Sequence, residues 1–459
     1  MKKPLMKNWT RNWIGIGSVL LAIPAATGLE TEARAQAANG QPPRPNAPPA
    51  GEVGTGDSVR FSFGAYLRDV AKGNLELVAQ RANVSIAQAQ LGIAKIFPDP
   101  TLTGGLYQYD VTQKGNPTAS IVQLAVPLQL GGKRGARISV AEGGISVAEA
   151  DLDDFLRLLR SASAGAYIDA LHARLILERK RRTAASLESL VAVNAQRLKA
   201  GDIGEVLLVQ SRVEAYQFRA QVLAAEGDVR GADLALLEQM GAAATAHMRH
   251  GVELGGDLRA VPERKFQVEA LVPFALSHRP DLRSAKKRVA LAHTVVDLAR
   301  ANRVIDVALG ASWQHNFPVT ASTPLPASDF LGGTLTVPLP FSRMYRGELD
   351  AAHASEGQSE TLSRAAEIHV EVEVRQAVSR YEAAAARVKL YTQDVLSDAD
   401  KVLEKTLYNY QRGGATLVEV LIAQHTVDDV YLSYYDALSD SAHALVAVQQ
   451  ASAFWDLEL

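Results

Sequence analysis

The sequence predicts an α+β membrane protein with an internal two-fold repeat, in which each unit has a pair of short strands followed by a long helical hairpin. Three observations lead to this prediction. Leu128–Val261 and Phe341–Leu459 contain no proline and are rich in residues that favour helices. Before each stretch, apolar and small polar residues alternate as they do in half-buried strands. Finally, Val126-Pro127-Leu128 recurs as Val337-Pro338-Leu339, 211 residues later.

The N-terminus predicts export. Basic residues precede an apolar stretch, Trp13–Ala26, which is too short to span a membrane. Ala33-Arg34-Ala35 then matches the small-residue pattern of a cleavage site. We therefore expect residues 1–35 to be a cleaved signal peptide. Residues 36–60, rich in Pro, Gly and Ala, should form a disordered tail.

The remaining chain divides into the two predicted units. The first, 61–265, should contain a helix, strands near 101–110 and 119–128, a helical hairpin at 134–240 and a linker at 241–265. The second, 266–459, should contain a helix at 268–303, strands near 306–317 and 330–338, and a hairpin at 347–452. One glycine in each hairpin, Gly201 or Gly413, should end the first helix and turn the chain. The arm Gly347–Tyr410 would be about 95 Å long if it were one helix, which is unusual for a globular domain.

The predicted strands carry one apolar face and one face of small and polar residues. In Val307–Phe317 the odd positions are apolar except for His315. The strands have about the length that a tilted membrane-spanning strand needs. The other face would line a wet lumen, with the following residues: Gly310, Ser312, Gln314, Gly332, Thr334 and Thr336.

Four strands cannot close a barrel, and open sheet edges are not tolerated in lipid. Either the sheet stays out of the membrane, or several chains pool their strands. Three chains would supply twelve strands, and the long hairpins could continue the ring as a helical tube. Such an assembly would be a duct.

The composition argues against several other functions. The 48 basic and 50 acidic residues are balanced and form no basic stripe, so nucleic acid is not an expected partner. The absence of cysteine excludes disulfides and thiolate metal sites. Without a phosphate-binding loop or an HExxH motif, we expect neither catalysis nor a cofactor. His247 and His250 could touch a metal but are interpreted as part of a solvated linker. Acidic Asp151–Phe155 is interpreted as a solvated helix face, with a charged ring in a lumen as the alternative.

Several motifs resemble the TolC-like outer-membrane efflux proteins, and the resemblance extends from about Ser62 to the C-terminus. The most specific motif is "YNYQRGGATLVEVLIAQHT" (Tyr408–Thr426), and "RLKAGDIGEVLLVQSRVEA" (Arg197–Ala215) resembles the family's first hairpin tip. "RPDLRSA" (Arg279–Ala285) and "RGELDAAHA" (Arg346–Ala354) resemble other recurrent segments. Within the family, the chain is most similar to the CzcC-type components of heavy-metal efflux pumps.

The resemblance implies a homotrimer with a twelve-stranded transmembrane β-barrel, four strands per chain, continued by a long periplasmic α-helical barrel. It also implies outer-membrane lipid as surroundings, a periplasmic adaptor (membrane fusion) protein on the hairpin tips, and an inner-membrane RND-type pump behind it. The chain would be the passive duct of this tripartite system, and metal cations would be its substrate. The expected adaptor-binding residues are Leu198, Lys199, Gly201, Glu205, Val206 and Leu207 at the first tip, and Tyr410, Arg412, Gly413, Thr416, Leu417 and Val420 at the second.

Other interpretations stay open at this point. The tip residues could simply be helix caps with a small apolar contact. The chain could be a soluble periplasmic coiled-coil scaffold whose strands pack against helices. The duct could also serve organic drugs or protein secretion. Lys133, Arg134, Arg343 and Arg346, which follow the strands, could solvate the junction between strand and helix or contact lipid headgroups.

Overall fold

The structure, a computed structural model, describes residues 59–108, 118–244, 252–318, 324, 326–339 and 347–457, which all belong to the unit Gly56–Leu459. The expected signal peptide and nearly all of the expected tail lie outside the described residues. So do His247, His250, Arg343 and Arg346.

The two strand pairs join into one antiparallel sheet, although nearly 180 residues separate them in the chain. The sheet order is β2-β3-β5-β6. The strands are β2 (Thr101–Gln108), β3 (Thr118–Leu128), β5 (Val307–Asn316) and β6 (Ser328–Thr336). The pairing of β3 with β5 connects the two halves of the sequence, and places Val122 opposite Trp313. Within the described residues β2 and β6 are the edges of this sheet.

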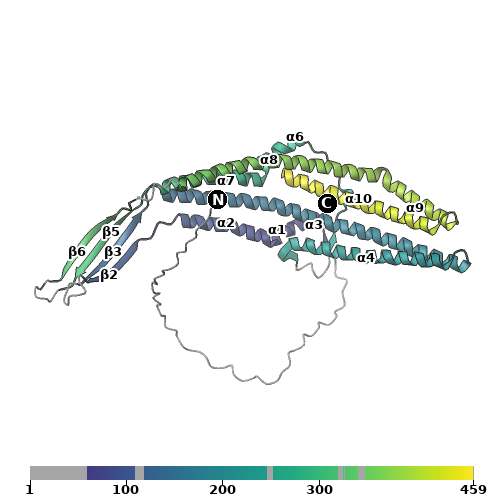
Figure 1. Ribbon diagram of the computed structural model, residues 1–459, viewed down its shortest axis with the longest axis horizontal. Helices are drawn as coiled ribbons and strands as arrows, with labels where there is room; N and C mark the ends of the chain where they lie inside the picture. The colour runs from purple at the N-terminus through teal and green to yellow at the C-terminus, as the bar shows by residue number, and fades with distance from the viewer. Residues whose placement is uncertain are drawn as a thin grey trace, which may run out of the picture. The chain divides into compact units, whose positions relative to one another are not determined.

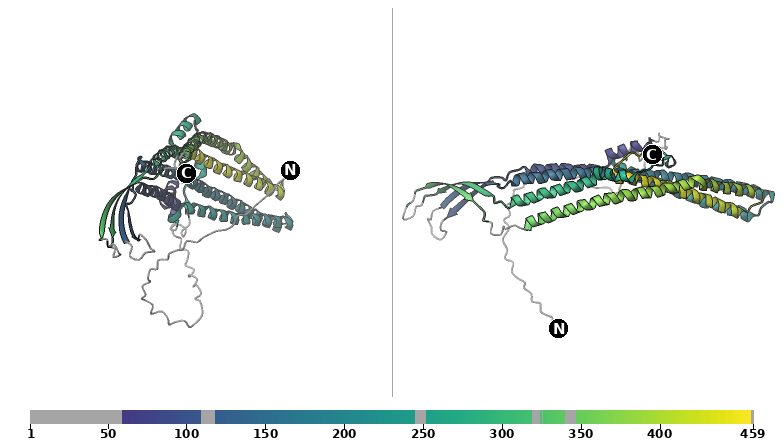
Figure 2. Two further views of the ribbon diagram at one scale, coloured as in Figure 1. Left: turned by 60° about the vertical axis from the view of Figure 1, so that its left-hand side comes forward. Right: turned by 90° about the horizontal axis from the view of Figure 1, so that it is seen from above.

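Long helices extend from the sheet (Figure 1). Next to the strands, α2 (Leu75–Ala94), α3 (Lys133–Ala200), α7 (Pro280–Asn302) and α8 (Gly347–Leu390) pack in that order as neighbours. Farther from the strands, α4 (Glu205–Met240), α3, α10 (Leu417–Ser452) and α9 (Leu396–Gln411) pack in that order. With 68 residues, α3 belongs to both groups and is roughly 100 Å long. Figure 2 shows from two further sides that the strands lie at one end of these helices.

Short elements pack where the two groups of helices meet. They include α1 (Phe63–Gly73), α6 (Val268–His278) and two 3₁₀ turns, η1 (Gly241–Ala243) and η2 (Leu258–Ala260). A small parallel pair is formed by β1 (Val59–Phe61) and β4 (Val252–Leu254). The main hydrophobic core lies among these elements, with Tyr66, Tyr167 and Ile168 fully buried.

The single helix expected at 268–303 is wrong, because the chain forms two helices there. Pro280 is the first residue of α7, a position that suits proline because its nitrogen has no hydrogen to leave unpaired. The same ring disfavours helical geometry at Arg279, which is extended with ψ 126°. The long arm of the second hairpin is interrupted as well, by the π-helical turn η3 (Tyr391–Val395) between α8 and α9.

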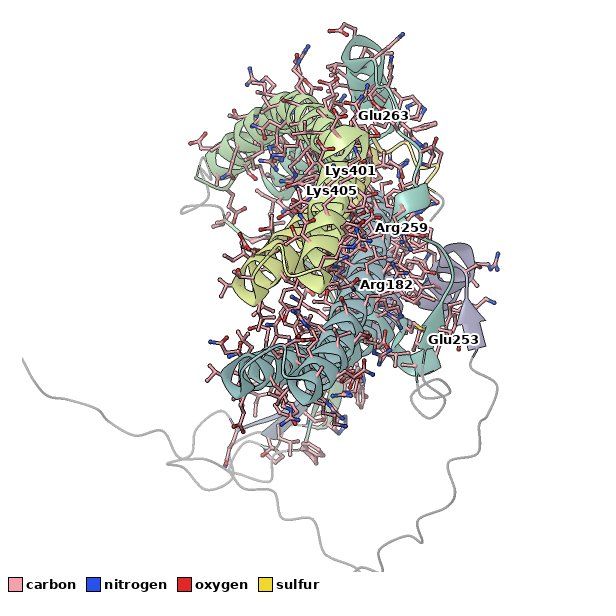
Figure 3. The ribbon with its side chains drawn as sticks, turned by 90° about the vertical axis from the view of Figure 1, so that its right-hand side faces the viewer. Arg182, Glu253, Arg259, Glu263, Lys401 and Lys405 are labelled. Atoms are coloured by element: carbon pink, nitrogen blue, oxygen red, sulfur yellow. The ribbon has the colours of Figure 1, made fainter. Side chains whose placement is uncertain are left out.

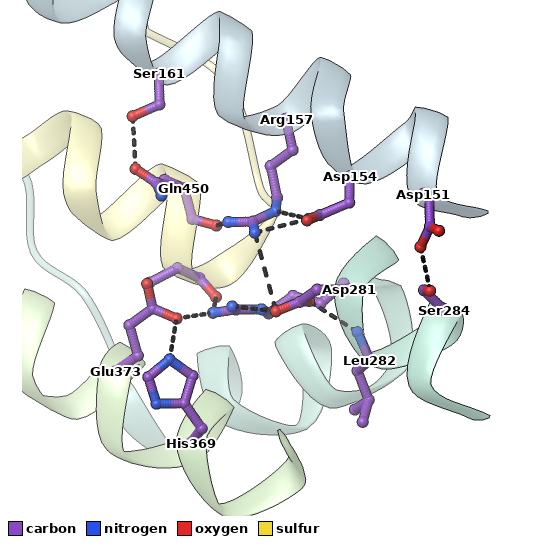
Figure 4. A network of polar contacts seen from close by, with 12 residues as sticks. Asp151, Asp154, Arg157, Ser161, Asp281, Leu282, Ser284, His369, Glu373 and Gln450 are labelled. Atoms are coloured by element: carbon purple, nitrogen blue, oxygen red, sulfur yellow. Dashed lines mark hydrogen bonds and ion pairs between the residues drawn. The ribbon is translucent and has the colours of Figure 1, made fainter. Parts of the chain in front are cut away.

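A polar network joins α3, α7, α8 and α10, and Figure 4 labels Arg157, Asp281, Glu373 and Gln450 among its members. Its centre is Arg279, at the break between α6 and α7. Its side chain is 2% exposed and donates to Asp281 at 3.0 and 2.6 Å, to the carbonyl of Ala451 at 2.9 Å, and to Glu373. Arg157 of α3 donates to the carbonyl of Gln450 at 3.0 Å, which connects α3 to α10. Buried ion pairs of this kind are weak evidence for stability, but they can fix how elements pack.

The acidic segment Asp151–Phe155 contributes to the same contacts. Asp151 pairs with Arg288 of α7 at 2.6 Å and accepts a hydrogen bond from Ser284, and Asp153 pairs with Arg283. The side chains of Asp151 and Asp153 are 40% and 51% exposed, so the segment is a solvent-accessible helix face as expected, and in addition it pairs with α7.

Candidate functional site

The residues expected to line a lumen share one face of the sheet. Gly310 lies opposite Thr334, and Ser312 lies opposite Gly332. Gln314 follows two residues later on the same face, and Thr336, the last residue of β6, lies opposite Ala308. A Cβ atom on Gly310 would lie 2.3 Å from Oγ1 of Thr334, so a larger residue there would force the Thr334 side chain to move.

The opposite face is mostly apolar and is uncovered, with the His315–Asp329 pair as a polar exception. Leu102, Leu106 and Leu331 are 73%, 76% and 86% exposed. The same face also presents five further exposed apolar side chains: Val122, Leu124, Leu309, Trp313 and Leu335. No helix of the described residues covers it, although the scaffold hypothesis requires such a cover. An apolar surface of this extent marks an interaction with lipid or another chain.

Lys133 connects the junction between β3 and α3 to the residue that precedes β5. Its side chain is 7% exposed, and Nζ lies 2.8 Å from Oδ2 of Asp306, the residue before β5. Oδ1 of Asp306 accepts a hydrogen bond from the backbone N–H of Leu130 at 3.0 Å. Burial raises the pKa of Asp306, but the hydrogen bonds from Lys133 and Leu130 outweigh it and hold that pKa below its ordinary value.

Arg134, the next residue, binds the end of α2. Its Nε donates to the carbonyl of Lys95 at 2.8 Å, and its guanidinium lies 4.4 Å from the ring centre of Phe97. Lys133 and Arg134 therefore attach the junction to other parts of the chain and do more than solvate it.

The two hairpin tips use the same turn. Gly201 and Gly413 both adopt left-handed backbone angles, with φ of 81° and 80°. Each glycine N–H donates to the carbonyl three residues earlier, and the next N–H donates to the carbonyl five before it, as in a Schellman motif. After the second turn, Thr416 and Glu419 cap α10 reciprocally, and this contact lowers the pKa of Glu419.

The predicted tip residues divide into an exposed and a buried group. The exposed residues are Lys199, Gly201, Glu205, Val206, Arg412, Gly413 and Thr416. Leu198 and Leu207 are half-buried. Tyr410, Leu417 and Val420 are only 3%, 2% and 1% exposed. These three side chains are covered within the chain, so they shape the tip and are not positioned to contact a partner directly.

The buried residues belong to a tip cluster in which the two hairpins meet, formed by Ala184, Leu187, Leu190, Ala215, Phe218, Tyr410, Leu417 and Val420. The hydroxyl of Tyr410 donates to Oδ1 of Asn194, which is fully buried, at 2.7 Å. Arg197 donates to the carbonyl of Tyr410 at 3.2 Å. Sequence reasoning missed Asn194 and Phe218, since nothing local distinguishes them from other residues of long helices.

A buried carboxylate joins the hairpins farther from the tips. Asp428 of α10 is 2% exposed and accepts hydrogen bonds from Arg179, Lys180 and Thr183 of α3 at 3.0, 2.7 and 2.8 Å. Burial raises the pKa of Asp428, but the bonds from Lys180 and Thr183 outweigh burial and lower it below its ordinary value. Seen from the tip end, the α9–α10 hairpin lies beside the α3–α4 hairpin, with Arg182 and Lys401 among the charged residues labelled (Figure 3).

The described residues contain neither a helix suited to crossing a membrane nor a cluster of metal-binding side chains. None of their helices is both long and apolar enough to cross a membrane. They also contain no group of three or more histidine and acidic side chains arranged to hold a metal ion.

Comparison with known proteins decides the family. A family model described as "Outer membrane efflux protein" matches residues 67–242 and 271–453. The chain belongs to the outer membrane efflux protein family. The predicted resemblance is therefore confirmed, and each matched segment of this efflux protein contains one strand pair and one helical hairpin.

Individual relatives agree with this assignment. The efflux protein is 23% identical to the cobalt-zinc-cadmium resistance protein CzcC of Cupriavidus metallidurans, over 84% of this chain and 88% of CzcC. A membrane protein from Pseudomonas aeruginosa shares its fold with a TM-score of 0.70 and 19% identity, covering 85% of this chain and 93% of that one. The Campylobacter jejuni CmeC outer membrane channel has a TM-score of 0.67 and 17% identity, covering 85% of both chains.

Proposed function

We propose that this efflux protein is the outer-membrane channel of a tripartite efflux system, a passive duct formed by three copies of the chain. The observation that carries the proposal is the four-stranded sheet with two open edges and an uncovered apolar face. Such a sheet is stable in lipid only if further strands close it into a barrel. Three copies would give twelve strands, enough for a barrel with an open interior.

The packing order of the elements supports a closed ring. One side of the chain ends in β2, α2 and α4, and the other side ends in β6, α8 and α9. Contacts between unlike edges of successive copies close into a ring when the rotation allows it. The matching turns at Gly201 and Gly413 support the proposal that each chain supplies two similar units to that ring.

Exposed apolar side chains on the edge helices support the same arrangement. On α4, Val209, Val213, Tyr216 and Leu223 are 48%, 50%, 67% and 63% exposed and recur at spacings of three, four and seven. This is the pattern of a coiled-coil seam without a partner. On the other edge, Leu362, Ile368 and Leu390 of α8 are exposed as well. A neighbouring copy would cover the stripe on α4.

The exposed tip residues are the proposed contacts for a periplasmic adaptor protein, with an RND-type pump of the inner membrane behind it. Val206 is 69% exposed and stands beside Glu205 at the start of α4. Arg412 and Gly413, in the turn of the second tip, are exposed as well. We further propose that the chain is exported and cleaved after Ala35, so that the mature protein begins at Gln36.

Metal cations are the proposed substrate class, supported by the 23% identity to a cobalt-zinc-cadmium resistance protein. The test is to delete the gene and measure growth inhibition by Co²⁺, Zn²⁺ and Cd²⁺ and by a panel of organic drugs. Sensitivity to the metals alone is expected. Sensitivity to the drugs alone would assign the duct to organic substrates instead.

The channel itself is tested on the purified protein. Native mass spectrometry should give three chains per particle, each beginning at Gln36. The protein should also remain in the membrane fraction after a carbonate wash. Extraction as a soluble monomer would refute the duct and favour a scaffold.

A further inference from the structure

Two clefts meet at Arg160 of α3. The first lies between α1 and α3 and has a volume of about 380 Å³. The second, of about 240 Å³, lies where α3 meets the ends of α6, α7 and α10. Leu156 and Arg160 line both, so the two clefts adjoin, and together they are called the Arg160 cleft. The first part is mostly apolar, with a lining that includes Gly64, Leu67, Val70, Ala71, Leu156 and Leu159.

The cleft carries positive charge that no acidic side chain offsets. Among the described residues, Arg68 and Arg160 form no ion pair, and no carboxylate lines the cleft. Burial lowers the pKa of Arg160, because part of its side chain loses water without gaining a carboxylate. Arg157, the other arginine of the lining, is paired with Asp154 at 2.7 Å. Arg160 is still exposed, so an anion can reach it from solvent.

Two buried polar atoms of the same lining have no hydrogen-bond partner in the described part of the chain. They are Nε1 of Trp455 and Oε1 of Gln449, and both residues line the cleft. Gln449 is 1% exposed, and its Nε2 donates to Oδ1 of Asp456 at 2.6 Å. Asp456 is itself paired with Arg264, so it does not neutralise Arg160. Buried polar groups are nearly always hydrogen-bonded, so the two orphaned atoms indicate a missing polar partner.

Ala453 places Trp455 against Arg160. As the C-cap of α10 it has a φ of 57°, a left-handed conformation that residues other than glycine seldom adopt. The chain turns there, and the ring centre of Trp455 comes to lie 4.4 Å from the guanidinium of Arg160. Rare backbone conformations of this kind are often found at binding sites, because the surrounding structure must hold them.

We propose that the Arg160 cleft binds a single-chain amphipathic anion, such as a fatty acid, with its alkyl chain between α1 and α3 and its anionic group at Arg160 and Trp455. Ligand sites are typically about 300–1,000 Å³, mostly apolar, with a few placed polar groups. The guanidinium and the indole N–H would both donate to the anionic oxygens, and the bond from the guanidinium would be charge-assisted. All these residues belong to one chain, so the site does not depend on the proposed trimer, channel or metal substrate.

Trp455 provides a fluorescent reporter in the cleft. Trp313→Phe leaves it as the only tryptophan after residue 35. Sodium dodecanoate is titrated into this variant of the protein, purified in a detergent with a neutral head group, and the fluorescence of Trp455 is followed. Dodecanol has the same chain without the charge, and acetate has the charge without the chain. We expect dodecanoate to give a saturable change, dodecanol to need a roughly 10-fold higher concentration, and acetate to give no change over the same range.

Substitutions in the same background test the two ends of the cleft. Arg160→Gln should raise the half-saturating concentration of dodecanoate roughly 10-fold, because it removes the charged donor. The matched control Arg182→Gln removes the same charge from α3, roughly 33 Å farther along the helix, and should change nothing. Gly64→Leu tests the apolar end. No atom lies within 4 Å of a Cβ at residue 64, so leucine fits there, and each methylene that it displaces from the cleft should cost roughly 4-fold in affinity.

Circular dichroism verifies that each variant is folded. Fluorescence that does not saturate with dodecanoate would overturn the proposal. So would dodecanol that binds as tightly as dodecanoate, since the site would then not recognise the charge. Equal binding by Arg160→Gln and Arg182→Gln would show that the anionic group does not lie at Arg160.

Discussion

Removing either partner of the Lys133–Asp306 pair should destabilise the protein, but by unequal amounts. Asp306→Ala leaves an ammonium group that is 7% exposed without a carboxylate, and also leaves the N–H of Leu130 without its acceptor. Loss of one partner from a fully buried pair costs about 3–5 kcal/mol. Because the Asp306 side chain is 37% exposed, water can partly replace it, and we expect about 2–3 kcal/mol.

Lys133→Met should cost only about 1 kcal/mol. Methionine preserves most of the apolar stem, and the carboxylate left behind is hydrated and still accepts the hydrogen bond from Leu130. The double variant should therefore be less destabilised than the sum of the two single variants, because no buried charge is left without a partner.

The assay is urea unfolding of the detergent-purified protein, followed by far-UV circular dichroism, with midpoints compared at equal slope. The pH dependence adds a second measurement. Since the pKa of Asp306 is lowered by folding, its stabilisation is present above the ordinary carboxyl pKa and is lost as the pH falls through the lowered value. The difference between wild type and Asp306→Ala should shrink as the pH falls below the ordinary carboxyl pKa. Equal effects of the two single variants, or a larger effect of Lys133→Met, would refute the reasoning.

Three further predictions concern the contact between the hairpins. Tyr410→Phe should reduce the free energy of unfolding by about 1–2 kcal/mol and so lower the thermal midpoint, because it removes the hydrogen-bond donor to the fully buried Asn194; an unchanged midpoint would show that this bond contributes nothing. Val418→Glu should prevent co-purification of the adaptor while leaving the thermal midpoint unchanged, whereas Val420→Glu should lower the midpoint, since the two are 55% and 1% exposed; identical behaviour of both variants would contradict this division. Asp428→Asn should destabilise the protein at pH 7, and the difference from wild type should shrink as the pH falls below the ordinary carboxyl pKa, since folding lowers the pKa of Asp428; a difference that stays constant as the pH is lowered would contradict the role of its charge.

Local patterns in the sequence were informative where one residue type decides the geometry. The alternation in Val307–Phe317 predicted which residues share a face of β5, because successive side chains of a strand point to opposite sides. Gly201 and Gly413 predicted the two turns, because a left-handed backbone favours glycine. The break before Pro280 was also encoded locally, since proline restricts the preceding residue. The periodic apolar residues on both sides of Pro280 nevertheless led to the prediction of a single helix at 268–303.

The division of the tip residues could not be predicted in the same way. Leu417, Val418 and Val420 are all apolar, and only the packing of α10 against α3 buries the first and third while exposing the second. A helix that is apolar over much of its surface does not reveal by its own sequence which side faces the partner.

The sequence by itself determined the signal-like N-terminus, the periodicity of strands and helices, the turn glycines and the motifs of the efflux family. Each of these depends on residues within a few positions of one another. The tertiary structure alone decided that Lys133 meets Asp306 and that His172 meets Asp436. Those partners are far apart in the chain. Charges attract through space, so their pairing follows from how α3 packs against the second half of the molecule.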